Sequence, residues 1–224
     1  MNISIFGYGK MGKIIEKIAI NRGHKIINTS NSKNPASCLN LEKTDVAIDF
    51  SNPESAFNNI SYAIKNKTPI ISGTTSWTKK MGEIKNLCLK ENGSFLYSSN
   101  FSLGMNILLQ INNQLAKIMK EKEYSCNIKE IHHIEKIDSP SGTALTIQED
   151  LRKILKKNIK ITSERIGDKI GIHNIKYSSK NDEIQIIHKA KKRNGFAYGA
   201  IIAAEWIVDK KGCFTMQDVL KNTT

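Results

Sequence analysis

The segment Glu130–Ala144, EIHHIEKIDSPSGTA, brings several chemically active side-chain types into one short stretch. Two adjacent histidines, His132 and His133, offer a proton carrier that works near neutral pH and a hydrogen-bonding neighbour. Lys136 adds a cation or a second acid. The run Ser141-Gly142-Thr143 opens a predicted helix, so its hydroxyls and backbone N–H groups can converge on one anion, most naturally a carboxylate. The segment predicts acid–base chemistry on a carboxylate-bearing substrate, although each histidine alone could be an ordinary strand residue and Ser141 a plain helix cap.

A glycine-rich turn near the N-terminus predicts a dinucleotide site. It follows the apolar run Ile3–Phe6 and consists of Gly7, Tyr8, Gly9, Lys10, Met11 and Gly12. In a strand–turn–helix context the first glycine permits the tight turn, the second lets the backbone approach a pyrophosphate and the third lets the helix lie close to the strand. The start of the helix supplies free N–H groups for the phosphates.

The stretch Asn28–Lys33 bears on which nicotinamide cofactor is used. Folds of this kind usually carry a carboxylate at the end of the second strand, where it binds the ribose hydroxyls. Here the stretch has no carboxylate, and Asn31 stands at or near that position. Since a carboxylate would repel a 2′-phosphate, its absence, with Lys33 and Lys10 nearby, favours NADPH or dual use over strict NADH.

Two further turns follow predicted strands and are expected at the same edge of the sheet. Loops at the carboxyl ends of parallel strands face the ligand crevice, and small or amide-bearing side chains there can bind a nicotinamide. They comprise Gly73, Thr74 and Thr75, and Ser98, Ser99, Asn100 and Phe101. Either could also be an ordinary capped turn.

Composition narrows the class of protein. The chain has 224 residues, 39% hydrophobic and 25% charged, as is usual for a globular protein. It shows no long apolar run and no signal-peptide pattern, so no membrane association and a cytoplasmic location are expected. The net charge of +13 comes from scattered lysines with few arginines, so no nucleic-acid partner is expected. The four cysteines match no zinc spacing, and no metal site is expected.

The first hundred residues alternate strand and helix, which predicts a parallel sheet covered on both faces. The predicted strands are 3–6, 25–29, 46–50, 69–72 and 94–97, and the predicted helices are 10–22, 53–66 and one within 77–92. A different pattern follows, with helices over 103–122, 141–155 and 197–208 and strands over 125–133, 159–165, 172–177 and 183–188.

The fold class predicted is α/β: an N-terminal Rossmann-type parallel sheet and a C-terminal α+β domain with a mixed sheet. We expect a dinucleotide-binding domain over 1–101, to which the tail from about 207 to 224 returns. A substrate-binding and oligomerisation domain is expected over 102–206.

The segment 130–144 closely resembles the signature of the 4-hydroxy-tetrahydrodipicolinate reductase (dihydrodipicolinate reductase) family. The resemblance covers nearly the whole chain. It includes the glycine loop, Asp49–Glu54, Gly73–Thr75, Asn100–Gly104, Gly171–His173 and the stretch from Arg193 to Trp206.

The resemblance implies a site and an activity. Members use NADPH or NADH to reduce a small cyclic dicarboxylate at its C4 with loss of water, on the diaminopimelate route to lysine, and are usually homotetramers. His132 matches the family's proton donor/acceptor and Lys136 its second proton donor. The substrate-binding positions match His133, Ser141, Gly142 and Thr143, and the cofactor contacts match residues 7–12, 73–75 and 98–101.

This chain departs from the family pattern at its cofactor end. The first glycine loop is one residue shorter than the commoner form, and the acidic ribose-binding position is Asn31 or a neighbour. Two other readings stay open. One is another two-domain Rossmann dehydrogenase for a semialdehyde or a sugar, and the other is a dinucleotide-binding module without catalysis.

Overall fold

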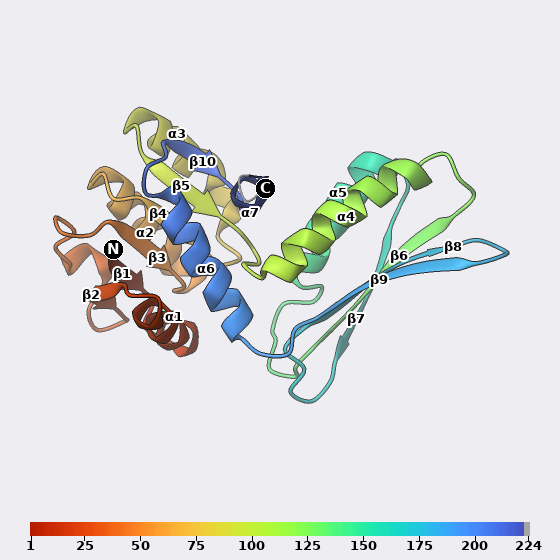
Figure 1. Ribbon diagram of the computed structural model, residues 1–224, viewed down its shortest axis with the longest axis horizontal. Coiled ribbons are helices and arrows are strands. Elements are labelled where there is room, and N and C mark those ends of the chain that lie inside the picture. The colour runs from red at the N-terminus through yellow and green to blue at the C-terminus, as the bar shows by residue number, and fades with distance from the viewer. Residues whose placement is uncertain (222–224) are drawn as a thin grey trace. The chain divides into compact units, whose positions relative to one another are not determined.

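The computed structural model describes residues 1–221, which form two compact units (Figure 1). The first unit joins Met1–Ser102 to the chain from Asn194 onward, and the second unit is Leu103–Arg193. The expected division instead gave residues 102–206 to the second domain and returned only the tail from about 207. The last three residues of that tail, 222–224, lie outside the described residues.

The first unit is a parallel sheet with helices on both faces, as expected for a Rossmann-type fold (Figure 1). Its six strands lie in the order β10-β5-β4-β3-β1-β2, and every neighbouring pair is parallel. The strands are β1 (Asn2–Phe6), β2 (Lys25–Ser30), β3 (Val46–Asp49), β4 (Ile70–Ser72), β5 (Ser94–Tyr97) and β10 (Gly212–Phe214). The helices are α1 (Lys10–Asn21), α2 (Pro53–Lys65), α3 (Met81–Lys90), α6 (Asn194–Ile207) and α7 (Met216–Lys221), with short 3₁₀ turns η1 (Ala36–Cys38) and η2 (Thr78–Lys80).

Helix α6 belongs to the first unit because its apolar surface is covered there. It contacts α1 and the strands β3, β4 and β5. Seven of its residues are buried, among them Ala200, Ile201 and Ala204. A helix that is apolar over most of its circumference must be buried on several sides. The sequence pattern predicted this helix but not which sheet it covers. The expected boundary between the domains was therefore placed after α6 rather than before it.

The second unit pairs one mixed sheet with two helices. The sheet has four strands in the order β7-β6-β8-β9, of which β6 and β7 are parallel and the other pairs antiparallel. The strands are β6 (Ser125–His132), β7 (Lys160–Arg165), β8 (Ile172–Ser178) and β9 (Glu183–Lys189), and the helices are α4 (Leu103–Met119) and α5 (Gly142–Leu155). The hydrophobic core combines residues of both helices with inward-facing strand residues such as Ile128 and Tyr177.

The predicted element boundaries differ from the observed ones mainly at ends. The helix expected over 103–122 stops at Met119, where the polar run Lys120–Glu123 follows. The short elements η1, η2, β10 and α7 carry too little periodicity to be predicted. Among the described residues, no helix has the length and apolar character needed to cross a membrane.

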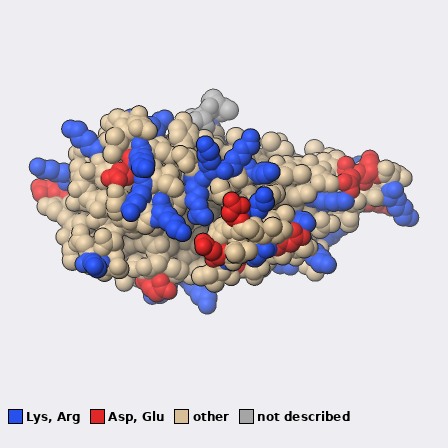
Figure 2. All heavy atoms as spheres, turned by 90° about the horizontal axis from the view of Figure 1, so that it is seen from below, with Lys and Arg blue, Asp and Glu red and all other residues tan. Residues whose placement is uncertain are grey.

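On the face shown in Figure 2, lysines and arginines are spread widely, with acidic side chains between them. All four cysteines are free thiols.

Candidate active site

A candidate cofactor site lies in the first unit, where the strand order of the parallel sheet reverses. From β1 the chain passes to β2 on one side, whereas β3 and β4 follow on the other side. The carboxyl ends of β1 and β3 therefore flank a switch point, where open α/β sheets bind ligands. The glycine loop follows β1 and the turn Phe50–Asn52 follows β3.

Backbone geometry explains the glycines of this loop. Gly7 has φ +95°, and a Cβ there would lie 2.3 Å from the Phe50 carbonyl oxygen. A Cβ on Gly12 would lie 2.5 Å from the Gly7 carbonyl oxygen, so this position allows α1 to start close to the strand. Among residues 1–221, no atom beyond Gly9 and its chain neighbours lies within 4 Å of the Cβ position of Gly9, and no side chain caps the first turn of α1. This geometry leaves the helix start open to an anion.

Two hollows adjoin the loop. A cavity of about 480 Å³ is lined by the glycine loop, by Ser30–Ser32 and by residues after β3; Gly7, Tyr8, Gly9 and Asn31 are among its lining residues. A second, of about 340 Å³, is lined by Gly9, Lys10 and Met11 together with Gly73, Thr74 and Thr75. The structure thus brings residues 7–11, Asn31 and residues 73–75 of the expected cofactor set around one edge of the sheet, and their chemistry fits a dinucleotide.

The residues after β5 occupy a neighbouring turn. The Ser98 hydroxyl donates to the Asn100 carbonyl at 2.7 Å, and the Asn100 side-chain oxygen accepts from the Ser102 N–H at 2.9 Å. The ring of Phe101 lies 5.6 Å from that of Phe50, which lines both hollows. The expected cofactor residues 98–101 directly follow β5, as predicted. They are not among the lining residues of either hollow.

Asn31 is exposed and organises its own turn. Its side-chain oxygen accepts from the backbone N–H groups of Lys33 and Asn34 at 2.9 and 3.0 Å. Its role toward a ribose stays a prediction. Tyr8, in the glycine loop, donates its hydroxyl to Glu16 on α1.

Asp49, for which the sequence suggested no role, ties the cofactor loops together. This fully buried carboxylate ends β3. One oxygen accepts from Ser51 at 2.6 Å and from Asn59 at 3.1 Å. The other accepts from Ser72 at 2.8 Å and Thr74 at 2.7 Å. Burial raises the pKa of Asp49, and these hydrogen bonds offset part of that rise.

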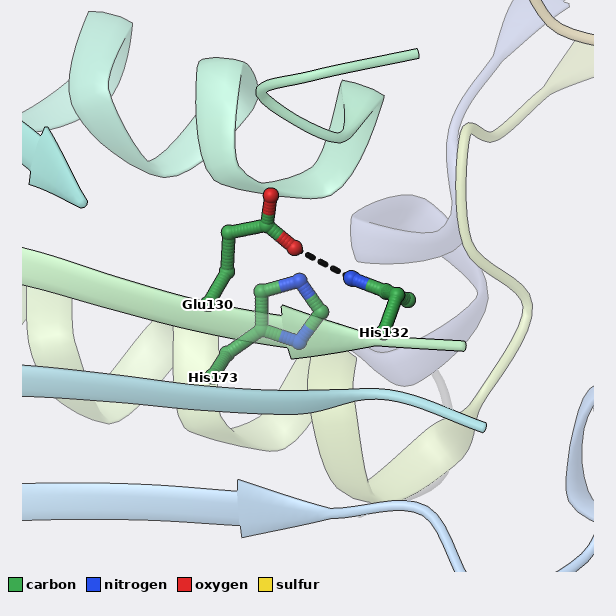
Figure 3. A group of neighbouring side chains, drawn as sticks. All are labelled: Glu130, His132 and His173. Atoms are coloured by element: carbon green, nitrogen blue, oxygen red, sulfur yellow. Dashed lines mark hydrogen bonds and ion pairs between the residues drawn. The ribbon is translucent and has the colours of Figure 1, made fainter. Parts of the chain in front are cut away.

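A second candidate site, for the substrate, lies in the mixed sheet of the second unit, on the face covered by α5. Alternation along β6 turns Glu130 and His132 to the buried face. The antiparallel register places His173 of β8 opposite Glu130, and the parallel register places Arg165 of β7 opposite His132. Figure 3 shows Glu130, His132 and His173 converging from two strands, with Glu130 bonded to His132.

Glu130 is the centre of this cluster. It is fully buried, and one oxygen accepts from Nδ1 of His132. The other accepts from Nη1 of Arg165 at 3.0 Å and from the Ser141 N–H at 3.3 Å. Burial alone would raise the pKa of Glu130, but the neighbouring side chains of Ser163, Arg165 and His132 outweigh it and hold the pKa below its ordinary value. Glu130 is therefore ionised at neutral pH.

Both inward-facing histidines, His132 and His173, are neutral at neutral pH. Burial lowers the pKa of His132, and the bond to Glu130 offsets part of that fall. Burial lowers the pKa of His173 further, to about 3. The two rings meet edge to face at 5.2 Å, and Nε2 of His173 lies 3.3 Å from the Ser141 hydroxyl.

The loop after β6 holds the remaining expected residues. Nζ of Lys136 pairs with Asp138 at 2.7 Å, and the other oxygen of Asp138 accepts from the Gly142 N–H at 3.3 Å. Ser141 is buried and caps α5, its hydroxyl accepting from the Ala144 N–H at 3.3 Å. Thr143 is buried in the first turn of α5. The Nδ1 atom of His133 is buried and has no hydrogen-bond partner within residues 1–221.

Sequence reasoning gave no role to four residues of the site: Asp49, Glu130, Arg165 and His173. A period-two reading of β6 could have found Glu130, because the residue two before a candidate catalytic histidine shares its face of the strand. Arg165 and His173 depend on strand pairing, for which the sequence carries no local signal.

Two family models match nearly the whole chain. The model described as "Dihydrodipicolinate reductase, N-terminus" matches residues 1–101, and the model described as "Dihydrodipicolinate reductase, C-terminus" matches residues 104–220.

Relatives and solved structures agree with these matches. The chain is 44% identical to the 4-hydroxy-tetrahydrodipicolinate reductase of Christiangramia forsetii, with 99% of this chain and 98% of the relative covered. It is 35% identical to the protein of the same name from Thermosipho africanus, with the same shares covered. In fold it is similar to the dipicolinate-bound dihydrodipicolinate reductase of Paenisporosarcina sp. TG-14, with a TM-score of 0.80 at 19% identity, over 97% of this chain and 98% of that one.

Proposed function

The chain belongs to the dihydrodipicolinate reductase family, a family of oxidoreductases, and from this premise we propose that it reduces 4-hydroxy-tetrahydrodipicolinate to tetrahydrodipicolinate with NADPH or NADH. The substrate in this proposal is taken from the names of the relatives. The cofactor class is taken from the family of the matching N-terminal domain. The reaction belongs to the diaminopimelate route to lysine.

One observation gives the substrate class a physical basis in this chain. The Asp138 carboxylate bridges Nζ of Lys136 and the Gly142 N–H at the start of α5. These two groups already bind a carboxylate of the protein. A carboxylate of a small dicarboxylate substrate suits the same partners, since a helix start and a lysine both favour an anion. Ser141, Thr143 and His133 are the other proposed substrate-binding residues.

The cofactor site fits a dinucleotide through its backbone. Gly7, Gly9 and Gly12 give the tight turn, the open approach and the close helix start, and the start of α1 offers N–H groups to the pyrophosphate. When bound, the dinucleotide would supply a hydride for reduction of the substrate ring at C4. Residues 7–12, Asn31, 73–75 and 98–101 are the proposed contacts.

His132 and Lys136 are the proposed proton carriers. The hydroxyl that leaves C4 must gain a proton in order to depart as water. In the free protein His132 is neutral because it is buried. A bound dicarboxylate brings negative charge to the site, which favours the protonated imidazole. His132 would therefore take up a proton as the substrate binds and be ready to act as an acid, with Lys136 as the second donor.

Cofactor preference follows from the turn after β2. The residues 30–34 present no carboxylate, so nothing there repels a 2′-phosphate. We propose that NADPH is used at least as well as NADH. Cytoplasmic location, assembly as a homotetramer, and the absence of nucleic-acid, membrane and metal partners stay predictions.

A coupled assay tests the proposed reaction. The substrate is made in situ from pyruvate and aspartate semialdehyde by the synthase of the preceding step, and loss of the reduced-nicotinamide absorbance is followed. Oxidation that requires the synthase and both of its substrates supports the proposal. No oxidation by folded protein that binds NADPH would end it.

A further inference from the structure

The carboxylate of Glu130 is bonded to three different groups, one of which is the imidazole of His132. It is completely buried, and both oxygens accept hydrogen bonds. A buried charge needs this number of partners to be stable. A residue that accepts the Nδ1 proton of a histidine also fixes the tautomer, so Nε2 is the nitrogen that can accept a proton or bind a ligand.

The orientation of His132 is restrained on several sides. Glu130 holds Nδ1, and the ring of His173 meets the His132 ring edge to face. On a third side lies Gly171, where a Cβ would be only 3.0 Å from Nε2. Within residues 1–221, Nε2 of His132 has no hydrogen-bond partner from the protein. Nδ1 is thus occupied, and Nε2 is the ring nitrogen left for a ligand.

Arg165 holds Glu130 in turn. Its Nη1 donates to Glu130 at 3.0 Å, and its Nη2 donates to the Asp138 carbonyl at 2.6 Å. Its guanidinium therefore links the carboxylate behind His132 to the loop that carries Lys136. The positive charge of this guanidinium favours the ionised form of Glu130.

From this geometry we propose that Glu130 is the positioning residue of His132: its carboxylate holds the imidazole proton on Nδ1 and leaves Nε2 as the proton-transfer atom. The inference rests on the proposed function for its catalytic consequence. Glu130 touches no reacting atom and acts through His132.

A metal ion is the other use that this cluster suggests. One ligand atom each from Glu130, His132 and His173 lie within 4.8 Å of one another. However, the carboxylate already accepts three hydrogen bonds, and the Arg165 guanidinium places a fixed positive charge beside it. A divalent cation would have to displace those donors against that charge. The cluster therefore favours orientation of the imidazole over metal binding.

The charged and titratable groups around His132 determine the pH dependence expected of a Glu130 variant. They are Glu130 on its own strand, Arg165 on β7, His173 on β8, and Lys136 and Asp138 in the following loop. Only the two carboxylates favour the imidazolium. Glu130→Gln removes the nearer one, so the pKa that His132 contributes to the pH profile of kcat should fall.

The decisive measurement is the tautomer of His132, read from long-range ¹H–¹⁵N imidazole spectra of histidine-labelled protein above neutral pH. The His132 signals are assigned by their loss in His132→Gln. We expect a protonated Nδ1 and an unprotonated Nε2 in the wild type. Glu130→Gln should shift the population toward protonated Nε2, because a glutamine amide can donate to Nδ1. Glu130→Asp should keep the wild-type tautomer. An Nε2-protonated wild type, or a tautomer unchanged in Glu130→Gln, would overturn the proposal.

Kinetics supply the second readout. Glu130→Gln should lower kcat roughly 10²-fold and move its pH profile to lower pH, with KM for NADPH unchanged and partial recovery in Glu130→Asp. The matched control is Glu164→Gln on β7, whose carboxylate pairs with Lys129 at 2.6 Å, and it should leave both readouts unchanged. Chelation of divalent cations should also change nothing, and activity that depends on a cation would overturn the proposal.

The outcomes separate this inference from the proposed function. A wild type without turnover but with the expected tautomer response would end the proposed function and leave the orientation of His132 by Glu130 intact. Turnover by the wild type, together with a His132 tautomer that does not change in Glu130→Gln, would support the proposed function and end the proposal about Glu130. If Glu130→Gln does not fold, the wild-type and Glu130→Asp spectra still decide, since the wrong tautomer in either contradicts the proposal.

Discussion

Two fully buried carboxylates organise the two units, and they do so with different partners. Asp49, at the end of β3, accepts four hydrogen bonds from neutral side chains: those of Ser51, Asn59, Ser72 and Thr74. Glu130, in β6, accepts from a guanidinium, an imidazole and a backbone N–H. The pKa of Asp49 is raised by its burial, whereas the partners of Glu130 overcome burial and lower its pKa.

The difference in partners separates two uses of a buried carboxylate. Hydroxyl and amide donors do not ionise near neutral pH, so Asp49 can only hold the loops that carry them. An imidazole can exchange a proton, so the state of Glu130 affects the chemistry of His132. Damage at Asp49 should appear in cofactor binding and stability, and damage around Glu130 in kcat and pH dependence.

The largest effect is expected at His132. His132→Gln should lower kcat roughly 10²–10⁴-fold, because it removes the proposed general acid while keeping a polar side chain of similar reach. The dissociation constant for NADPH should not change, since the cofactor residues belong to the other unit. The coupled assay and a fluorescence titration measure the two quantities. His133→Gln, one residue along, should instead act mainly on substrate KM, and an equal loss of kcat in both variants would contradict separate roles.

The next effect concerns stability in acid. The pKa of His173 is about 3 in the folded protein, against an ordinary value of 6.5. Between these values the unfolded chain binds a proton that the folded chain does not, so stability is present above pH 6.5 and is lost as the pH falls toward 3. From about pH 7.5 to about pH 5 this group alone should remove about 2 kcal/mol of unfolding free energy.

Urea unfolding of wild type and His173→Asn at the two pH values isolates that contribution. The variant should lose about 2 kcal/mol less than the wild type between the two pH values, whatever its stability at the higher one. The comparison subtracts the carboxylates that both proteins share. Equal losses of unfolding free energy in the two proteins would mean that the pKa of His173 is not lowered in the folded protein. The cluster around Glu130 would then be more accessible to water than it is in this structure.

Asp49→Asn should affect the cofactor. The asparagine amide brings a donor into a group of donors and leaves at least one of them without an acceptor, which costs about 1–3 kcal/mol. With the loops less firmly held, KM for NADPH should rise roughly 10-fold while kcat at saturating cofactor stays close to wild type. Asp45→Asn, at an exposed position just before β3 that accepts from the Asn2 N–H at 2.6 Å, is the control. A fall in kcat with unchanged KM would remove the distinction between the two carboxylates.

An effect no larger than that of Asp49→Asn is expected at Asn31, the proposed ribose-binding residue. Asn31→Asp can keep the turn, because its carboxylate accepts from the same N–H groups of Lys33 and Asn34. The added charge should repel a 2′-phosphate and reduce the kcat/KM ratio of NADPH to NADH by roughly 10-fold. An unchanged ratio would show that Asn31 does not face that phosphate.

The alternation of strand and helix could be predicted from sequence because it is local. Buried strands such as Val46–Asp49 read as short apolar runs, and Gly7 and Gly12 mark the turn between β1 and α1. The allocation of α6 could not be predicted, because its apolar surface shows only that it is buried and not which sheet covers it. The short β10 lacks a pattern of its own and pairs with β5 through tertiary structure.

The candidate site divides in the same way. His132 and Lys136 could be proposed because their types and spacing are visible in one segment. Arg165 and His173 reach His132 through strand register, and Asp49 reaches Thr74 through packing of two loops. Supporting residues of this kind are set by pairing across the sheet, which a single sequence does not record.

The most direct test of the account follows the transferred hydrogen. Wild-type protein is given NADPH carrying deuterium at the transferable position of the nicotinamide C4, with substrate made in situ, and the product is analysed by mass spectrometry. The account predicts tetrahydrodipicolinate with a single deuterium at ring C4, formed in step with NADPH oxidation and strongly slowed in His132→Gln. Oxidation of NADPH without deuterium in this product, or no oxidation by protein that binds the cofactor, would contradict it.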